Sequence, residues 1–221
     1  CYATIPAGDH RETWPVRSRT FRRWLARAFY EKEARPVAAQ ALQDAIGFLE
    51  AEAQFAGPRH PVHVRLAEYE GRIYLDLCND RWEAVEVGPE GWTIVTDPPV
   101  KFVRKRGMLP LPQPRAGGSV AQLRDFLNVD DDGWCLLLAW LLAALRPRGP
   151  YPVLVLHGPQ GCGKSTTVRL LRSLVDPSMA ALRATPREER DLAITASNSW
   201  VLAFDNLSSL QPWLSDALCR V

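Results

Sequence analysis

A glycine-rich run in the second half of the chain has the residue types and the spacing of a phosphate-binding loop. Residues 158–165 read GPQGCGKS, which fits the pattern G-x-x-x-x-G-K-[ST]. Glycines let such a loop curl until successive N–H groups point at phosphate oxygens, beside the positive end of the following helix. We expect Lys164 to reach the β- and γ-phosphates of ATP and the Ser165 hydroxyl to bind Mg²⁺. The predicted nucleotide contacts are Gly158, Pro159, Gln160, Gly161, Cys162, Gly163, Lys164, Ser165 and Thr166.

The segments on both sides of this loop match the context that the motif requires. Residues 152–157 read PVLVLH, a run of leucine and β-branched residues that is typical of a central strand in a parallel sheet. Residues 166–174 have a helical pattern, so the order is strand, glycine loop and helix. The alternative is a glycine-rich turn that carries a lysine by chance.

A second residue that is a candidate for binding the metal lies 41 residues beyond Lys164. Residues 200–205 read WVLAFD, so that Asp205 ends a hydrophobic strand, where a Mg²⁺-binding carboxylate is expected. The alternative is an aspartate that caps the next turn. Asn206 follows, and its amide can orient a water molecule but cannot accept its proton at neutral pH. The predicted catalytic residues are therefore Lys164, Asp205 and Asn206, with Glu189 or Asp191 as further candidates for the missing base.

The chain divides at a stretch that is dense in proline and glycine. Residues 107–118 show no usable periodicity, which predicts a linker between two modules. We therefore predict an α/β protein: an N-terminal α+β module over residues 1–112, a linker over 113–118, and a P-loop domain with a parallel sheet over 119–221.

The first module is predicted to contain a helical pair followed by an antiparallel meander. Apolar residues recur at helical spacing from Phe21 to Phe29 and from Ala38 to Ala53. From His63 onward apolar and polar residues alternate, with a turn at Glu70 and Gly71, and this predicts short strands. Further strands are predicted near residues 82–87, 92–96 and 100–104, and further helices over 119–127, 133–146 and 213–220.

Composition indicates an ordinary intracellular protein. The net charge is only +2, so any contact with nucleic acid must be local. Five cysteines lack the C-x-x-C pattern and are expected to be reduced thiols. The most apolar run, residues 134–145, is too short to cross a bilayer, and the N-terminus has no signal-peptide pattern. We expect a cytoplasmic protein without a membrane segment.

Two basic clusters are candidates for contact with DNA. One surrounds the first helix, and the other precedes the linker, where Phe102 is a candidate for stacking on a base. The alternative is that both are solvated polar faces. The clusters are Arg17, Arg19, Arg22, Arg23 and Arg27, and Lys101, Arg104, Lys105 and Arg106.

Three stretches resemble the ATPase core of phage and plasmid-type primase-helicase proteins, which are grouped with the superfamily-three helicases in the AAA+ class. They read GPQGCGKST, RATPREERDLAITASNSWVLAFDN and LSSLQPWLSDALCR. The stretch from HRETWPVRS to PPVKFVRKRGMLPLP resembles the segment that commonly precedes this ATPase, so the likeness spans nearly the whole chain. It assigns phosphate and metal binding to Gly158, Gly163, Lys164 and Ser165, and metal binding to Asp205.

The resemblance implies an AAA+-like fold, binding of ATP and Mg²⁺, and a homo-oligomeric ring that pulls on single-stranded DNA during replication of a mobile element. Such cores continue past Asp205 with a sensor strand and an arginine finger, whereas only 16 residues follow here. The first residue is Cys1 and not Met. Both observations predict a fragment that binds nucleotide weakly and hydrolyses it poorly.

Two other functions are compatible with the same loop. A P-loop kinase that acts on a small molecule has this loop, but it normally adds an arginine-bearing lid after the second motif. A non-enzymatic adaptor uses the loop only to sense ATP, while its first module binds a partner. Stimulation of ATP hydrolysis by single-stranded DNA, phosphate transfer to a small molecule, and binding without turnover distinguish the three.

Overall fold

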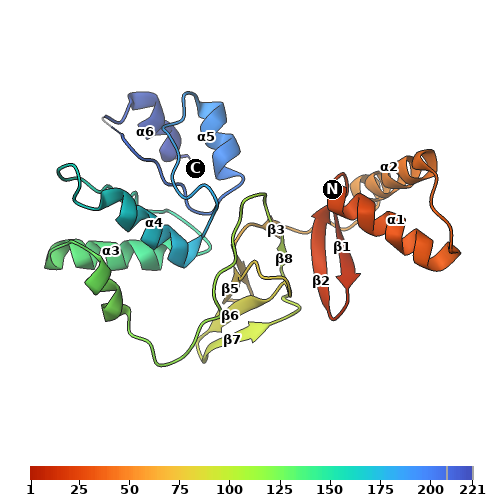
Figure 1. Cartoon of the computed structure of the whole chain (residues 1–221), viewed down its shortest axis with the longest axis horizontal. Coiled ribbons are helices and arrows are strands. Elements are labelled where there is room, and N and C mark those ends of the chain that lie inside the picture. The colour runs from red at the N-terminus through yellow and green to blue at the C-terminus, as the bar shows by residue number, and fades with distance from the viewer. Residues whose placement is uncertain (208, 221) are drawn as a thin grey trace.

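The computed structural model describes residues 1–207 and 209–220, and its elements form three consecutive parts (Figure 1). A hairpin with two helices comes first, small β-sheets follow, and helices dominate the C-terminal part. Among the described residues, no helix is long and apolar enough to span a membrane.

The N-terminal part is a β-hairpin packed on a helical pair. Strands β1 (Tyr2–Ala7) and β2 (His10–Pro15) pair in antiparallel fashion, and helices α1 (Arg19–Glu33) and α2 (Ala39–Phe55) follow. The helices lie where helical periodicity predicts them, whereas the sequence analysis did not predict the hairpin. The hydroxyl of Ser18 caps α1 by accepting the Phe21 N–H. The buried hydrophobic residues of this part are Ile5, Val16, Phe21, Leu42 and Ile46.

The central part contains the antiparallel meander. Strands β4 (Leu66–Tyr69), β5 (Arg72–Asp76), β6 (Ala84–Gly88) and β7 (Gly91–Val95) pair in chain order. Glu70 and Gly71 form the predicted turn, both with positive φ. The short strands β3 (Val62–His63) and β8 (Lys101–Phe102) form a separate parallel pair, so the last predicted strand does not extend the meander.

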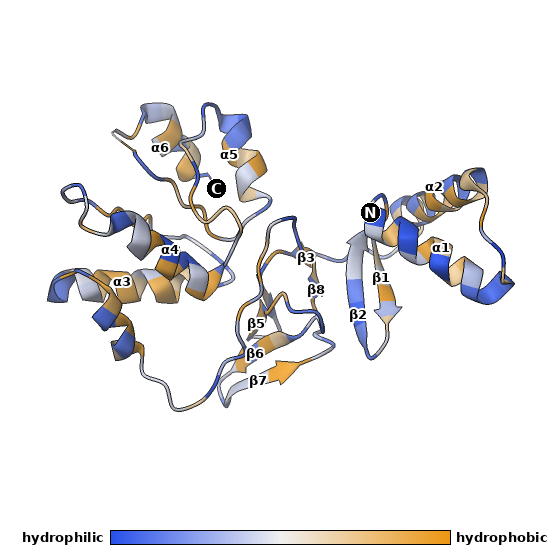
Figure 2. Cartoon of the chain, viewed as in Figure 1, coloured by the Kyte–Doolittle hydropathy of each residue, from blue (hydrophilic) through white to orange (hydrophobic). Residues whose placement is uncertain are grey.

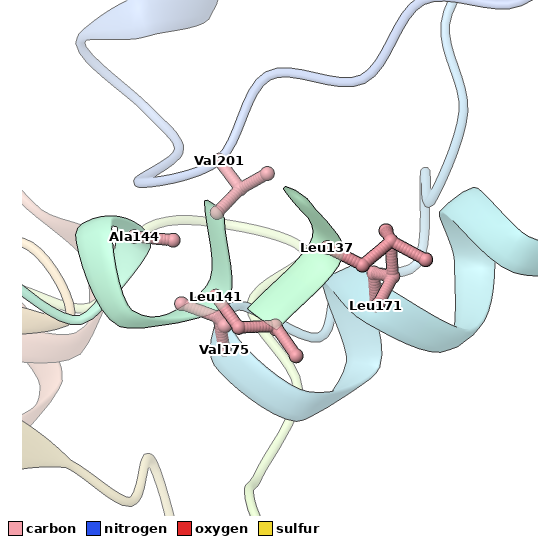
Figure 3. Close-up of a cluster of buried hydrophobic side chains, with 6 residues drawn as sticks. All are labelled: Leu137, Leu141, Ala144, Leu171, Val175 and Val201. Carbon is pink, nitrogen blue, oxygen red and sulfur yellow. The ribbon is translucent and has the colours of Figure 1, made fainter. Parts of the chain in front are cut away.

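The C-terminal part begins with a 3₁₀ helix, η1 (Val120–Phe126), in place of the predicted regular helix. Four α-helices follow: α3 (Asp131–Ala144), α4 (Lys164–Val175), α5 (Glu189–Ala196) and α6 (Pro212–Leu218). Helix α3 is apolar through its middle (Figure 2). Its buried side chains pack against α4 and Val201 (Figure 3), and the cluster comprises Leu137, Leu141, Ala144, Leu171, Val175 and Val201.

The predicted parallel sheet of this part is represented by a single bridge. Arg183 and Phe204 form it, with the Arg183 N–H donating to Ala203 and the Asp205 N–H donating to Arg183, both at 3.0 Å. Residues 152–157 are not a strand, and within the described ranges no backbone hydrogen bond reaches them. A strand needs a neighbour for its backbone groups, and Val153 and Val155 are 66% and 73% exposed. The P-loop parallel-sheet domain therefore stays a prediction.

The start of the predicted linker stretch is ordered by both of its neighbours. Leu111 is buried against Leu77 and Val85 of the meander, and its N–H donates to Leu77. Leu109 donates to the carbonyl of Pro177, just after α4, at 2.9 Å. Residues 112–118 contain no helix or strand. Residues 107–111 are thus packed against both neighbouring parts, and residues 112–118 connect these parts without regular structure.

A buried ion pair joins the meander to the end of α4. Arg65 precedes β4 and is fully buried, and its Nε donates to the Asp176 carboxylate at 3.0 Å. Its other nitrogens donate to the carbonyls of Asp76, Leu109 and Pro177. A buried charge is stable only when its partners satisfy it in this way. The pair fixes the position of α4 relative to the small sheets.

We predict that Arg65→Met lowers the free energy of unfolding by about 3–5 kcal/mol, because it leaves the Asp176 carboxylate buried without its cation. Arg148→Met is the matched control, since Arg148 forms an exposed ion pair with Glu68 across the same two parts. This control should change the free energy by less than about 1 kcal/mol. Urea denaturation of both variants measures the difference, and equal effects would contradict the role given to Arg65.

Candidate nucleotide-binding site

The backbone of the loop at residues 158–163 has conformations that favour glycine. Gly158, Gly161 and Gly163 have φ values of +150°, +82° and +88°. A Cβ at Gly158 would lie 3.0 Å from the Cys162 Sγ, whereas Gly163 has open space and is restricted only by its left-handed backbone. Gly163 is also the N-cap of α4. The glycines thus let the chain turn sharply into the helix.

Lys164 folds back over this loop. Its ammonium donates to the carbonyl oxygens of Gly158 at 2.9 Å and Pro159 at 2.8 Å, and lies 3.7 Å from the Cys162 sulfur. These acceptors are neutral, and a phosphate oxygen is a stronger, charged acceptor for the same ammonium. The side chain is therefore held at the loop that the sequence assigns to phosphate.

Ser165 and Asp205 meet across 40 residues of sequence. The Ser165 hydroxyl lies 3.1 Å from Oδ1 and 3.0 Å from Oδ2 of the Asp205 carboxylate. Hydroxyl and carboxylate oxygens are the hard ligands that Mg²⁺ prefers. The two residues predicted to hold the metal are therefore adjacent in space and next to Lys164, and their donor set fits this ion.

Asp176 positions the two halves of this site. It follows α4 directly, and its Oδ2 accepts the N–H groups of Trp200 at 2.9 Å and Val201 at 3.1 Å. The Trp200 indole donates to the Ala144 carbonyl at 2.7 Å, which adds a tie to α3. The segment that ends at Asp205 is thereby anchored to the helix that begins with Lys164. Sequence reasoning missed Asp176, because neither its spacing nor its neighbours belong to the loop motif.

Arg172 lies on the buried face of α4 and holds the C-terminal end of this helix, where Asp176 follows. It donates to the carbonyls of Ala180 and Ala181 at 2.9 Å and to that of Asp176 at 3.2 Å. Burial lowers the pKa of its guanidinium, and the Asp176 carboxylate opposes this shift. The C-terminal end of α4 is thus held by buried charges, while its N-terminal end carries the loop.

Asn206 lies at this site, whereas neither candidate for the general base, Glu189 or Asp191, is hydrogen-bonded to Asp205 or to the loop among the described residues. The Asn206 N–H donates to the Asp205 carboxylate at 3.0 Å, and Asn206 has a φ of +57°. Glu189 forms an ion pair with Arg220 at 3.2 Å, and Asp191 lines a hollow of about 590 Å³ together with Arg183 and Phe204. In the part of the chain that the structure describes, Asp205 is the only carboxylate hydrogen-bonded to the loop or to the first turn of α4.

Two residues of the second basic region, Arg104 and the stacking candidate Phe102, are structural, whereas Lys101, Lys105 and Arg106 are half-buried or exposed and stay candidates for a DNA contact. Arg104 donates to the Asp76 carboxylate at 2.7 and 3.1 Å and to the Asn79 carbonyl, and its guanidinium lies 4.1 Å from the Trp82 ring centre. Phe102 is 5% exposed and belongs to the core of the small sheets, so it cannot stack on a base. The charge run had suggested a DNA contact because a sequence does not reveal which basic side chains have buried partners.

Together, a glycine loop, a lysine and a Ser–Asp pair at the head of one helix are the parts expected of a nucleotide-binding protein. Residues 119–221 match the family model of the actinomycete integrative conjugative element replication protein. This segment is thus similar to a replication protein of a mobile element, as the resemblance had led us to expect. The match begins at the first residue of the predicted C-terminal domain. No curated protein and no solved structure matches the chain.

We predict that Gly163→Ala lowers the free energy of unfolding by about 1–2 kcal/mol, because an L-residue must then adopt left-handed backbone. Gly118→Ala is the control: it also has open space around the added methyl group but no positive φ. It should leave stability unchanged or raise it slightly. Thermal and urea unfolding of both variants test this, and an equal loss at Gly118 would contradict the assignment.

Proposed function

We propose that residues 119–221 bind ATP with Mg²⁺ and form the ATPase motor module of a replicative helicase or primase-helicase of a mobile element, acting on DNA. The single observation that supports nucleotide binding most strongly is the contact of Ser165 with Asp205 beside the Lys164 loop. The family match supports the replication role. The proposed assembly is a homo-oligomeric ring around single-stranded DNA.

The residues have distinct roles in this proposal. The backbone N–H groups of residues 158–163 bind phosphate oxygens, and the N-terminal end of α4 adds its positive dipole. Lys164 exchanges its two carbonyl acceptors for the β- and γ-phosphate oxygens. Ser165 and Asp205 hold Mg²⁺, which neutralises negative charge on the phosphates. The predicted contact of Thr166 agrees with its exposed position in the first turn of α4.

Hydrolysis requires a group that activates water, and Asn206 provides only orientation. Its amide can hold the attacking water but cannot remove a proton from it. Nucleotide binding and turnover are therefore separable properties of this chain, and each needs its own measurement.

We expect Lys164→Ala to weaken MgATP binding about a hundredfold, because the loop loses its only charged donor to the phosphates. Lys32→Ala, an exposed lysine at the end of α1, is the control and should bind as the unaltered chain does. Asp205→Asn should remove the dependence of affinity on Mg²⁺. Calorimetric titration with ATP, with and without Mg²⁺, measures these effects. Unchanged affinity in Lys164→Ala would exclude the loop as the nucleotide site.

The same experiment, extended to turnover, separates the proposed functions. Release of phosphate from ATP that increases with single-stranded DNA supports the motor. Phosphate transfer to a small molecule supports a kinase, and binding without turnover supports a nucleotide-sensing adaptor. The absence of a base beside Asp205 among the described contacts is the observation that makes the adaptor the second candidate.

Cys162 provides an independent test, because it lies inside the loop and is partly accessible. We expect MgATP to slow alkylation of Cys162 by iodoacetamide at least tenfold, and not that of Cys135, which is exposed on α3. Burial raises the pKa of the Cys78 thiol, so this residue should react slowly in all samples. Mass spectrometry of the labelled peptides measures the rates. Equal protection of Cys135, or none of Cys162, would contradict nucleotide binding at the loop.

A further inference from the structure

Helix α1 begins with three arginines that have no acidic partner. In contrast, Arg17 pairs with Glu50 at 2.6 Å and Arg27 with Glu31 at 2.7 Å, so these two charges are compensated. Throughout residues 1–207 and 209–220, no ion pair involves the other three. Arg22, one of the three, donates a long hydrogen bond of 3.4 Å to the side-chain oxygen of Gln43. The three residues are Arg19, Arg22 and Arg23, and we call them the arginine triplet.

The arginine triplet borders one hollow. Its members are spaced at i, i+3 and i+4, so they share a face of the helix, and Ala26 continues that face one turn later. Together with Leu42 of α2 they line a concave site of about 300 Å³. Leu42 is buried in the core of the helical pair. The hollow therefore has an apolar floor and a cationic border.

The charges on the two helices beside this hollow differ in sign: α2 carries Asp44, Glu50 and Glu52, of which Glu50 pairs with Arg17, whereas the start of α1 is basic. Residues 13–30 contain five arginines and no aspartate or glutamate, and the first turn of α1 has no acidic residue. The positive end of the helix dipole adds to the same side. The helical pair lies at the opposite end of the molecule from α5 and α6 (Figure 1), and hydrophilic residues begin α1 (Figure 2). All three side chains of the arginine triplet are exposed, so a large anion can reach them.

We propose that the arginine triplet and its hollow bind the phosphodiester backbone of DNA without reading its sequence. Guanidinium groups bind phosphate through two parallel hydrogen bonds, and several charges on one ridge match a chain with one phosphate per nucleotide. The choice of DNA as the ligand rests on the proposed function, to which this site adds a DNA contact. Arg104 and Phe102 of the cluster before the linker are internal, whereas all three arginines of the triplet on the N-terminal helical pair are exposed.

The test compares two triple variants of the 221-residue chain that lose the same charge. The first is R19Q/R22Q/R23Q. The control, R59Q/R115Q/R190Q, removes three exposed arginines that form no ion pair among the described residues. Fluorescence anisotropy of a labelled single-stranded oligonucleotide gives affinity as a function of salt concentration. We expect the first variant to bind at least tenfold more weakly at 0.1 M salt, with the slope of log affinity against log salt reduced by about 2. The control should retain the original slope.

A charge-conserving variant separates DNA contact from a loss of folding. R19K/R22K/R23K should retain the salt slope and lose only part of the affinity, because lysine preserves the charge but not the paired hydrogen bonds. All variants should melt at the same temperature and bind MgATP as before, so a failure here is distinguishable from a failure at Lys164. A slope of R19Q/R22Q/R23Q equal to that of the control would overturn the proposal. The proposal would also be overturned if R19Q/R22Q/R23Q lost binding to polyglutamate but kept its binding to DNA. That result would identify the triplet as a docking site for an acidic protein.

Discussion

The ion pair between Arg65 and Asp176 is the constraint on which the rest of the structure depends. One carboxylate oxygen of Asp176 accepts the Arg65 guanidinium from the meander, and the other accepts two backbone N–H groups of the segment that leads to Asp205. Both residues are almost completely inaccessible to solvent. Because an unpaired charge there is so costly, the Asp176 carboxylate couples the stability of the small sheets, α4 and residues 200–205.

Arginine serves three physical purposes in this molecule. Arg65, Arg104 and Arg172 are internal and satisfy carbonyl and carboxylate oxygens from several elements at once. Others form exposed pairs of little energetic value. The arginine triplet combines exposure with a shared hollow. A planar group that always carries its charge suits all three purposes, and lysine, which is rare in this chain, suits fewer of them.

The extent to which sequence predicted this structure follows from the range of each interaction. Periodicity over a few residues predicted α1, α2 and the turn at Glu70 and Gly71. The contact of Ser165 with Asp205 was predictable because each belongs to a motif that binds the same metal ion. The Arg65–Asp176 pair spans 111 residues and has no local signature. The hairpin was missed because Pro6 lies within its first strand and Pro15 ends its second. The run at residues 152–157 has strand composition, but composition cannot supply a pairing neighbour.

The two ends of helix α4 differ in how firmly they are held. Its last turn is fixed by Arg172, Asp176 and the buried Val175, whereas its first turn carries Lys164 and Ser165 on partly accessible backbone. Twelve residues make a rod about 18 Å long. A displacement of about 1 Å at the loop then corresponds to a tilt of about 3° around the fixed end. Because the buried contacts of Arg172 and Asp176 hold its C-terminal end, a displacement of the loop would rotate the helix about that end.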